Sequence, residues 1–292
     1  MNQLRNFQRN LSGIRVLDPA CGCGNFLVVS YREIRQIELD CIKRIRKIIK
    51  DAQQEIIAGE MSPSIVNVDQ FYGIEIEGFP ARIAEVALYL VDHQANMALS
   101  DELGQYLPRI PLRTSPHIWR ENALRLDWPA VLKPSECSYI VGNPPFRGKK
   151  TRSAQQQADM GLIFGGWKSA GNLDYVACWY KKTLDYVSNT SIEAALVSTN
   201  SICQGEQVSL LWPRLLENGL HINFAHRTFE WTSEARGRAA VHVIIIGFSG
   251  TGANRTRKFL YDHPNLDGSL TTTVPVTTIN PYLVDGPPVV VT

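Results

Sequence analysis

The sequence lacks the features of several large protein classes. Its 292 residues contain no apolar run long enough to span a bilayer, and the first five residues do not begin a signal peptide. The formal net charge is only +2. The composition as a whole therefore does not indicate nucleic-acid binding, and any such surface must come from local clusters of basic residues. These absences predict a cytoplasmic protein without a membrane partner.

The six cysteines are too dispersed for a zinc site. Only Cys21 and Cys23 are close together, and a C-x-C pair without a second cysteine pair or nearby histidines is not a zinc signature. We therefore expect reduced, buried thiols and no metal ion. The hydrophobic content of 44% is ordinary for a globular protein, and the length suits one large α/β domain or two smaller ones.

What the sequence does contain is a stiff turn after a short apolar strand, between Tyr139 and Phe146. Pro144 and Pro145 fix φ and carry no N–H, so the Asn143 amide and the Pro144 carbonyl are free to act as two outward acceptors. Two acceptors beside an aromatic ring suit a planar group with an exocyclic amine, such as adenine. When both N–H bonds of that amine donate to these two acceptors, the transition state for attack by the amine nitrogen is stabilised. The alternative is a loop that merely contains two prolines. For the four residues from Asn143 to Phe146 alone, this alternative and a functional turn are about equally compatible with the sequence.

A turn of small residues lies near the N-terminus, where the apolar run from Gly13 to Leu17 leads into DPACGCGNF. Strand, small-residue turn and helix is the order needed for a nucleotide-type ligand. The dinucleotide fingerprint is incomplete because its third glycine falls at Leu27. The acidic Asp18 suits a cationic amino group better than a pyrophosphate. The candidate residues of this turn are Asp18, Pro19, Ala20, Cys21, Gly22, Gly24 and Asn25.

Two further strand ends carry candidate ligand-binding residues. The segment from Gln70 to Glu77 predicts a strand ending at Glu75 and Ile76, where a carboxylate can accept from ribose hydroxyls. A surface acid capping the helix that starts near Pro80 is the alternative. The segment from His117 to Trp119 predicts another strand. Beyond it, either Asn122 or Asp127 is a candidate for binding an adenine amine, with Leu124 or Trp128 packing on the ring.

The remaining pattern predicts further helices and strands. Apolar residues at spacings of three and four, such as Ile34, Ile37 and Cys41, predict a helix from Tyr31 to about Glu60 with an apolar stripe. The basic residues on its other face are those of a solvated surface. Further helices are expected over residues 80–96, 172–187 and 210–216, and strands over residues 193–198, 221–229 and 241–248, the last two as an antiparallel pair.

In this order, DPACGCGNF, FYGIEIE, ENALRLDW and VGNPPF resemble segments of class I S-adenosylmethionine-dependent DNA N6-adenine methyltransferases. They are most similar to the catalytic module of the MmeI-like type II restriction–modification family, in which one chain both cuts and methylates. The resemblance runs from about Val16 to the C-terminus and includes INPYLVDGP at residues 279–287. Cys23 departs from the family, which usually has serine there, and we expect a change in cofactor affinity at most.

The resemblance implies an α/β fold with a Rossmann-like, doubly wound, mostly parallel seven-stranded methyltransferase sheet and an antiparallel C-terminal hairpin. It implies that Asp18 to Gly24 hold the methionine part of S-adenosylmethionine, Glu75 its ribose and the Asn122–Asp127 turn its adenine. The Asn143–Phe146 turn then holds the flipped target adenine. We expect a catalytic domain over residues 1–250 and an irregular segment over residues 251–292 that leads toward a target-recognition region.

Double-stranded DNA is the expected partner. The basic residues directly after the catalytic turn are well placed for phosphates, and an aromatic near the hairpin loop, Phe229 or Trp231, is a candidate contact to the target base. The expected DNA-binding residues are Arg147, Lys149, Lys150, Arg152 and Trp231. The alternatives are methylation of an RNA base or a protein glutamine, or cofactor binding without turnover. We also expect the nuclease and target-recognition parts of the family to lie outside this chain.

Overall fold

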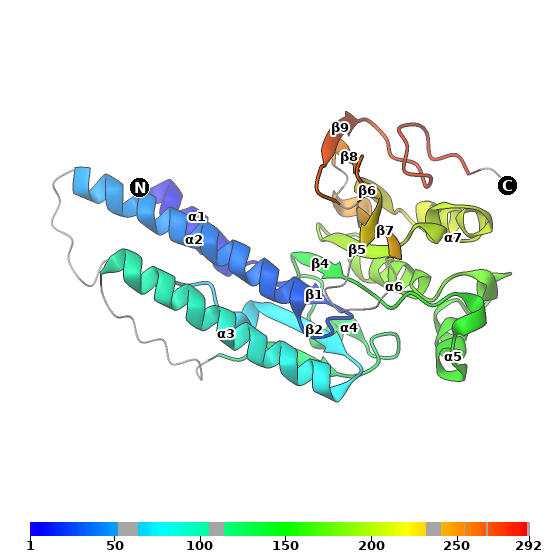
Figure 1. Ribbon diagram of the computed structural model, residues 1–292, viewed down its shortest axis with the longest axis horizontal. Helices are drawn as coiled ribbons and strands as arrows, with labels where there is room; N and C mark the ends of the chain where they lie inside the picture. Colours follow the sequence, from blue (N-terminus) through cyan, green and yellow to red (C-terminus); the bar gives the residue numbers. More distant parts are fainter. Residues whose placement is uncertain (52–63, 105–113, 232–240, 254, 267, 291–292) are drawn as a thin grey trace. The chain divides into compact units, whose positions relative to one another are not determined.

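Short buried strands alternate with long helices in the first part of the chain, and a longer mixed sheet follows in the second. The computed structural model describes residues 1–51, 64–104, 114–231, 241–253, 255–266 and 268–290 (Figure 1). The chain divides into two units, Met1–Asn122 and Ala123–Thr292. No helix of the described residues is long and apolar enough to cross a membrane.

The first unit contains three parallel strands in the order β3-β2-β1. Val16 pairs with Phe71, and Gly73 pairs with Ile118. Because all three strands run in the same direction, their carboxyl ends share one edge of the sheet. The elements are α1 (Asn2–Ser12), β1 (Val16–Asp18), α2 (Asn25–Asp51), η1 (Val68–Gln70), β2 (Phe71–Glu75), α3 (Gly78–Leu103) and β3 (His117–Arg120).

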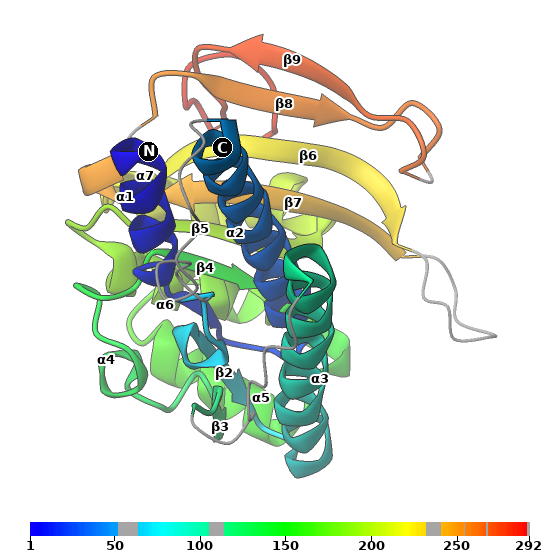
Figure 2. The same ribbon diagram turned by 90° about the vertical axis from the view of Figure 1, so that its left-hand side faces the viewer.

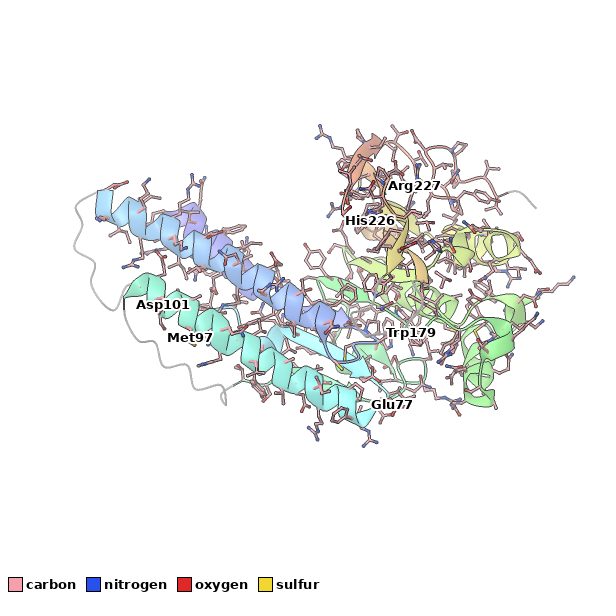
Figure 3. All side chains as sticks on the ribbon, viewed as in Figure 1. Glu77, Met97, Asp101, Trp179, His226 and Arg227 are labelled. Atoms are coloured by element: carbon pink, nitrogen blue, oxygen red, sulfur yellow. The ribbon has the colours of Figure 1, made fainter. Side chains whose placement is uncertain are left out.

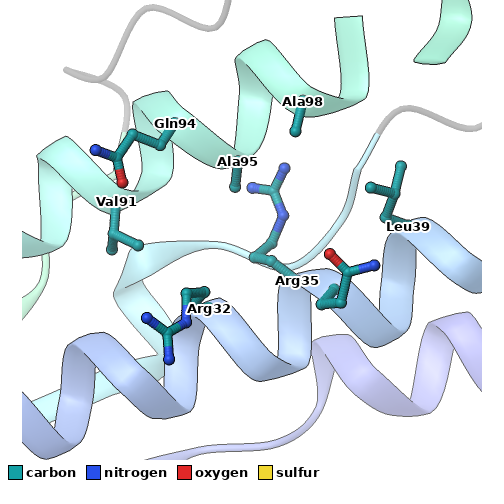
Figure 4. Close-up of a pocket in the computed structure, with 8 residues that line it drawn as sticks. Arg32, Arg35, Leu39, Val91, Gln94, Ala95 and Ala98 are labelled. Atoms are coloured by element: carbon teal, nitrogen blue, oxygen red, sulfur yellow. The ribbon is translucent and has the colours of Figure 1, made fainter. Parts of the chain in front are cut away.

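Helices α2 and α3 run side by side and are joined by a buried polar network (Figure 1). Arg35 of α2 is 4% exposed and points toward α3 in the close-up of Figure 4. Its guanidinium donates to Asp92 (3.0 Å) and Asn96 (2.9 Å) of α3 and pairs with Glu38 of its own helix (3.3 Å). A buried cation with this many acceptors is satisfied only when the two helices keep one register.

The predicted helix over residues 31–60 is confirmed up to Asp51, and its remainder lies outside the described residues. Its buried face differs from the predicted apolar stripe. Ile37 is 45% exposed, whereas Arg35 and Glu38 are buried. The stripe was misplaced because hydrophobic periodicity treats a charged residue as a surface residue, and the network with α3 buries two of them.

The second unit contains six strands among its described residues, in the order β4-β5-β7-β6-β8-β9 (Figure 2). β4 and β5 are parallel, and β7 is antiparallel to both of its neighbours, β5 and β6. The predicted antiparallel pair is thus confirmed. The elements are α4 (Trp128–Val131), β4 (Tyr139–Gly142), η2 (Lys149–Thr151), α5 (Ala154–Ile163), η3 (Ala170–Asn172), α6 (Ala177–Val187), β5 (Glu193–Thr199), η4 (Asn200–Cys203), α7 (Glu206–Glu217), β6 (His221–Trp231), β7 (Val241–Ser249), η5 (Thr251–Ala253), β8 (Lys258–Asp262) and β9 (Thr272–Val276).

The segment after Gly250 was expected to be irregular, and for two stretches this was wrong. β8 pairs in parallel with β6 through Phe224 and Phe259, and β9 pairs with β8. β9 contains Pro275 and lies at the edge of the sheet, where a residue without an N–H is tolerated. The described residues therefore contain all seven expected strands and two more. Proline and threonine in this segment obscured the strand pattern.

Candidate functional site

The turn after β1 is held by hydrogen bonds to the end of β2. The N–H of Cys21 donates to the Ile74 carbonyl (3.1 Å), and the N–H of Gly22 donates to Glu75 Oε2 (2.9 Å). Gly22 (φ +54°) and Gly24 (φ +85°) adopt left-handed conformations that other residues rarely take. A Cβ at Gly22 meets no atom within 4 Å, so the backbone faces open space there. The predicted approach of a ligand to this backbone is sterically possible.

Asp18, at the end of β1, is a buried carboxylate with one oxygen left over. Its Oδ1 accepts from the N–H of Ala20 (3.0 Å), whereas its buried Oδ2 has no partner within the described residues. Burial raises the pKa of Asp18 to about 7, and the charge of Glu75 adds to this, while the Ala20 hydrogen bond acts in the opposite direction. A positively charged amine supplies both the donor and the charge that this oxygen lacks.

Glu75, at the end of β2, is oriented by the backbone on both sides. Its Oε2 accepts from Gly22, and its Oε1 accepts from the N–H of Glu77 (2.8 Å), at the start of α3 (Figure 3). Each carboxylate oxygen can accept more than one hydrogen bond, so capacity remains for two hydroxyl groups. Ile76 is 54% exposed and Phe79 is 78% exposed beside it.

Phe79 was not a predicted site residue. An exposed aromatic at the start of α3, just past Glu75 and Ile76, offers a flat apolar surface for a ring. Its position four residues after the acidic strand end was the signal in the sequence.

The segment after β3 contains the two candidates that the sequence left open. In the first unit, the N–H of Glu121 donates to the Glu75 carbonyl (3.0 Å), so Asn122 follows directly beyond the end of β2. Asp127 is the N-cap residue of α4 in the second unit. Leu124 and Trp128, expected to pack on a ligand ring, are both 1% exposed and have no free face. That expectation was wrong, because sequence does not separate a core side chain from a ligand contact.

The second-unit part of this segment, Ala123–Asp127, is held by hydrogen bonds to two of its backbone carbonyls. The Trp128 indole donates to the Ala123 carbonyl (2.8 Å), and the Lys182 ammonium of α6 donates to the Leu126 carbonyl (2.6 Å). Burial lowers the pKa of Lys182 to about 8, against the opposing charges of Asp127 and Asp185. The turn is therefore fixed to α4 and α6.

The turn from Asn143 to Phe146 follows β4. The Asn143 Oδ1 atom is buried and has no hydrogen-bond partner within the described chain. Pro144 is buried, and Pro145 is exposed. The Arg147 carbonyl, immediately after Phe146, accepts from the N–H of Tyr175 (2.8 Å). The turn thus presents an unused acceptor on a stiff backbone that is tied down at its far end.

The basic residues after this turn do not all have the same environment. Arg147 and Lys150 are exposed, whereas Lys149 donates to the Asn172 side chain (2.8 Å). Arg152 donates through Nη2 to the Gly171 carbonyl (2.6 Å). Its Nε and Nη1 atoms are buried and have no partner in the described part of the chain, so they match an acceptor such as a phosphate oxygen.

The two aromatic candidates of β6 differ in exposure. Trp231, the last residue of β6, is 36% exposed. The Phe229 ring lies 4.7 Å from the ring of His263, the residue directly after β8. The loop that joins β6 to β7 lies outside the described residues.

The stretch INPYLVDGP forms a turn that is fastened to β6. Arg227 Nε donates to the Leu283 carbonyl (2.8 Å), and its Nη1 donates to Asp262 of β8 (3.0 Å). Asn280 Oδ1 accepts from the N–H groups of Tyr282 and Val284 within the turn. Figure 3 shows Arg227 next to His226 on β6. Arg227 thereby connects the C-terminal turn to the sheet.

The described residues contain no cluster of three or more side chains suited to a metal ion.

Comparisons with known proteins show which family the chain resembles. The family model described as "MmeI, DNA-methyltransferase domain" matches residues 1–262. DNA methyltransferase A of Bacillus subtilis is 39% identical over 287 residues, which cover 97% of this chain and 31% of that protein. The structure of the type IIL restriction–modification enzyme MmeI in complex with DNA is 50% identical, with a TM-score of 0.91 over 99% of this chain and 38% of that one.

A more distant structure supports the fold alone. The type IIG restriction endonuclease BpuSI superposes with a TM-score of 0.52 at 14% identity, over 90% of this chain and 26% of that one. Together these likenesses confirm the predicted α/β, Rossmann-like methyltransferase fold. The chain spans less than two fifths of the length of the relatives it matches, at 31% and 38%.

Proposed function

The chain belongs to the family of MmeI DNA-methyltransferase domains, and we propose that it transfers a methyl group from S-adenosylmethionine to the N6 amine of an adenine flipped out of duplex DNA. The predicted resemblance to the restriction–modification methyltransferases is confirmed at the level of the family. The cofactor, the base and the atom methylated are our proposals, and they rest on the donors and acceptors of the two turns.

The residues of the first unit fit the cofactor. Asp18 Oδ2 is a buried acceptor that lacks a donor, and the ammonium group of a methionine moiety is such a donor. The open face of Gly22 admits the ligand close to the backbone, and Glu75 is oriented to accept from ribose hydroxyls. Ile76 and Phe79 offer exposed apolar surface to the adenine ring, with Asn122 as the proposed partner of its amine. When bound, the cofactor supplies an electrophilic methyl group.

The Asn143 Oδ1 atom is the single observation that carries the proposed chemistry. An acceptor buried without a partner is costly unless a donor arrives with the substrate. An adenine amine brings two N–H groups, one for Asn143 Oδ1 and one for the Pro144 carbonyl. Accepting from both favours a pyramidal nitrogen with an available lone pair, and this stabilises the transition state of methyl transfer.

The surroundings of the turn suit the rest of the substrate. We assign Phe146, which is half-buried, to stacking on the flipped base, and Trp231, at the carboxyl end of β6, to a second contact with that base. Arg147 and Lys150 are exposed and available for flanking phosphates. Arg152 offers two donors without partners to the same backbone. A dedicated general base is not required, because the amine proton can leave to water after attack.

A methyl-transfer assay tests this function. Tritiated S-adenosylmethionine is incubated with the chain and with duplex DNA, RNA or a glutamine-containing protein, and digested DNA is separated into nucleosides. We expect the label in DNA, in the nucleoside N6-methyldeoxyadenosine. Label in RNA or protein only, or cofactor binding without transfer to any substrate, would contradict the proposal.

The division of this chain into functional parts is also our proposal. We propose residues 1–250 as the catalytic domain, with residues 251–292 leading toward a target-recognition region and β8 adding to β6. DNA binding by this chain should rest mainly on phosphate contacts. Such binding weakens steeply as salt rises and shows little sequence preference.

A further inference from the structure

A buried carboxylate on α5 lies between two elements of the proposed site. Asp159 is 1% exposed. Its Oδ1 accepts from Arg125 Nε (2.7 Å), and its Oδ2 accepts from the Tyr175 hydroxyl (2.7 Å). All three residues belong to the second unit. The helix that carries Asp159 is fixed at its start by a capping box between Ser153 and Gln156.

One donor belongs to one of the two turns, and the other donor is bonded to the residue that follows the second turn. Arg125 lies within Ala123–Asp127, the second-unit part of the proposed cofactor-adenine turn. The backbone N–H of Tyr175 donates to the Arg147 carbonyl (2.8 Å), one residue after Phe146 of the proposed target-base turn. Asp159 is therefore the shared point of a chain of contacts from one turn to the other.

The geometry makes these contacts strong. A buried carboxylate needs compensating donors, and charge-assisted hydrogen bonds at 2.7 Å are of the strong kind. The Arg125 side chain is 47% exposed, so it reaches from the surface to a carboxylate with 1% exposure. Burial and the bond to Asp159 raise the pKa of Tyr175, which keeps its hydroxyl protonated as a donor. The Gln155 amide, in the orientation that matches donors to acceptors, accepts from Arg125 Nη2 (2.7 Å).

We propose that Asp159 is a positioning residue that couples the cofactor-adenine turn to the target-base turn. This inference rests on the proposed function for the identity of the two ligands. A ligand that orders Ala123–Asp127 also orders Arg125, and through Asp159 and Tyr175 it orders the backbone that holds Phe146. By reciprocity, a base held at Phe146 strengthens binding at the cofactor turn by the same factor.

The first experiment measures this coupling without any ligand or activity. Hydrogen–deuterium exchange is followed in peptides covering residues 122–132 and 139–150 of the chain. Three variants separate the contacts of Asp159. Asp159→Asn keeps the shape of the side chain but removes its charge and one acceptor. Arg125→Gln removes one of the two donors to Asp159, and Tyr175→Phe removes the other. Glu217→Gln is the matched control, because Glu217 is an exposed carboxylate at the end of α7 and lies outside both peptides.

We expect Arg125→Gln to speed exchange in both peptides, although only one contains the substitution. Asp159→Asn should do the same more strongly, and Glu217→Gln should change neither peptide. If Arg125→Gln affects residues 122–132 alone, the two turns are independent and the inference is wrong. Thermal unfolding identifies variants that lose the fold. Tyr175→Phe removes a single oxygen atom. It tests whether a change next to the target-base turn also speeds exchange in residues 122–132.

The second experiment uses S-adenosylmethionine binding by calorimetry and single-turnover transfer to DNA. Loss of one hydrogen bond to a charged group corresponds to roughly a tenfold change or more. Asp159→Asn should weaken cofactor binding about tenfold and slow transfer about tenfold as well. Tyr175→Phe should slow transfer with a smaller change in cofactor affinity.

The two hypotheses fail in different ways. If the unaltered chain neither binds the cofactor nor transfers the methyl group, the proposed function is wrong, while the exchange data still decide the coupling. If the unaltered chain is active and Asp159→Asn has unchanged affinity and rate, the coupling is wrong and the proposed function stands.

Discussion

The glycine turn after β1 and the proline turn after β4 solve the same structural problem in opposite ways. Each follows a strand, and each contains a buried side-chain oxygen without a partner in the described residues, Asp18 Oδ2 in one and Asn143 Oδ1 in the other. The first turn obtains its shape from flexible glycines held by contacts with β2 and α3. The second obtains it from Pro144 and Pro145, whose φ is fixed covalently.

This difference predicts which substitutions each turn tolerates. A glycine turn depends on its neighbours, so changes in Glu75 or Ala84 should reach it. A proline turn depends little on its surroundings, so changes within it should alter chemistry more than stability. We expect affinity and stability effects from the first turn and rate effects from the second.

The largest effect is expected from Asn143→Ala. This substitution removes the acceptor that acts on the target amine, and loss of one preorganised transition-state group typically slows a reaction by about 10²–10³-fold. Cofactor affinity should stay within about twofold, a difference well below 1 kcal/mol. Methyl transfer and calorimetry measure the two quantities. Near-normal turnover at saturating cofactor and DNA would remove Asn143 from the chemistry.

Glu75→Ala should weaken S-adenosylmethionine binding by about 1–3 kcal/mol, since hydrogen bonds to a charged acceptor are lost. The same substitution releases the N–H groups of Gly22 and Glu77, so the first turn also loosens. Glu77→Ala is the control, because it removes a neighbouring exposed carboxylate of the same charge. Equal affinities of both variants in calorimetry would exclude Glu75 from the site.

The two glycines should differ in a way that the prolines do not. Gly22→Ala introduces left-handed strain of about 1–2 kcal/mol without a clash. Gly24→Ala adds a contact of 2.9 Å with the Ala84 Cβ, so it should destabilise the fold further. Pro145→Ala should lower stability by less than about 1 kcal/mol, through the unfolded chain. Urea unfolding ranks the three, and equal midpoints for the glycine variants would contradict the packing argument.

The last prediction concerns the pH dependence of stability. Because folding raises the pKa of Asp18 to about 7, the folded chain holds this proton more tightly than the unfolded chain. Its contribution is complete below about pH 4 and is lost as the pH rises toward 7, with a slope of at most about 1.4 kcal/mol per pH unit. Urea unfolding at several pH values should show this slope, and Asp18→Asn should remove it. An identical slope in the variant would assign the titration to another group.

Much of the fold was predictable because the strands that carry the two turns are apolar and end in distinctive residues. Asp18 and Asn143 were expected to offer available acceptors, and Asp18 Oδ2 and Asn143 Oδ1 both lack a partner in the described chain. Helix α5 was not predicted, although its capping box of Ser153 and Gln156 was a local signal. Its polar composition concealed it.

Contacts between distant residues were beyond the sequence. Burial of Arg35 between two helices, and of Asp159 between Arg125 and Tyr175, depends on partners 16 to 61 residues away. A pattern that assigns charged residues to the surface places both wrongly. Leu124 and Trp128 show the opposite error, because apolar residues near a site were assigned to a ligand and belong to the core.

The reactivity of the cysteine thiols makes it possible to measure ligand binding at the glycine turn after β1. Of the six cysteines, only Cys23 is exposed, and it lies between Gly22 and Gly24. The other five are buried, and burial raises the pKa of the adjacent Cys21 thiol, which disfavours its reactive thiolate. An alkylating reagent should therefore modify Cys23 first. A ligand seated on the turn shields this thiol, so the rate of alkylation reports occupancy of the turn without a label or a substituted residue.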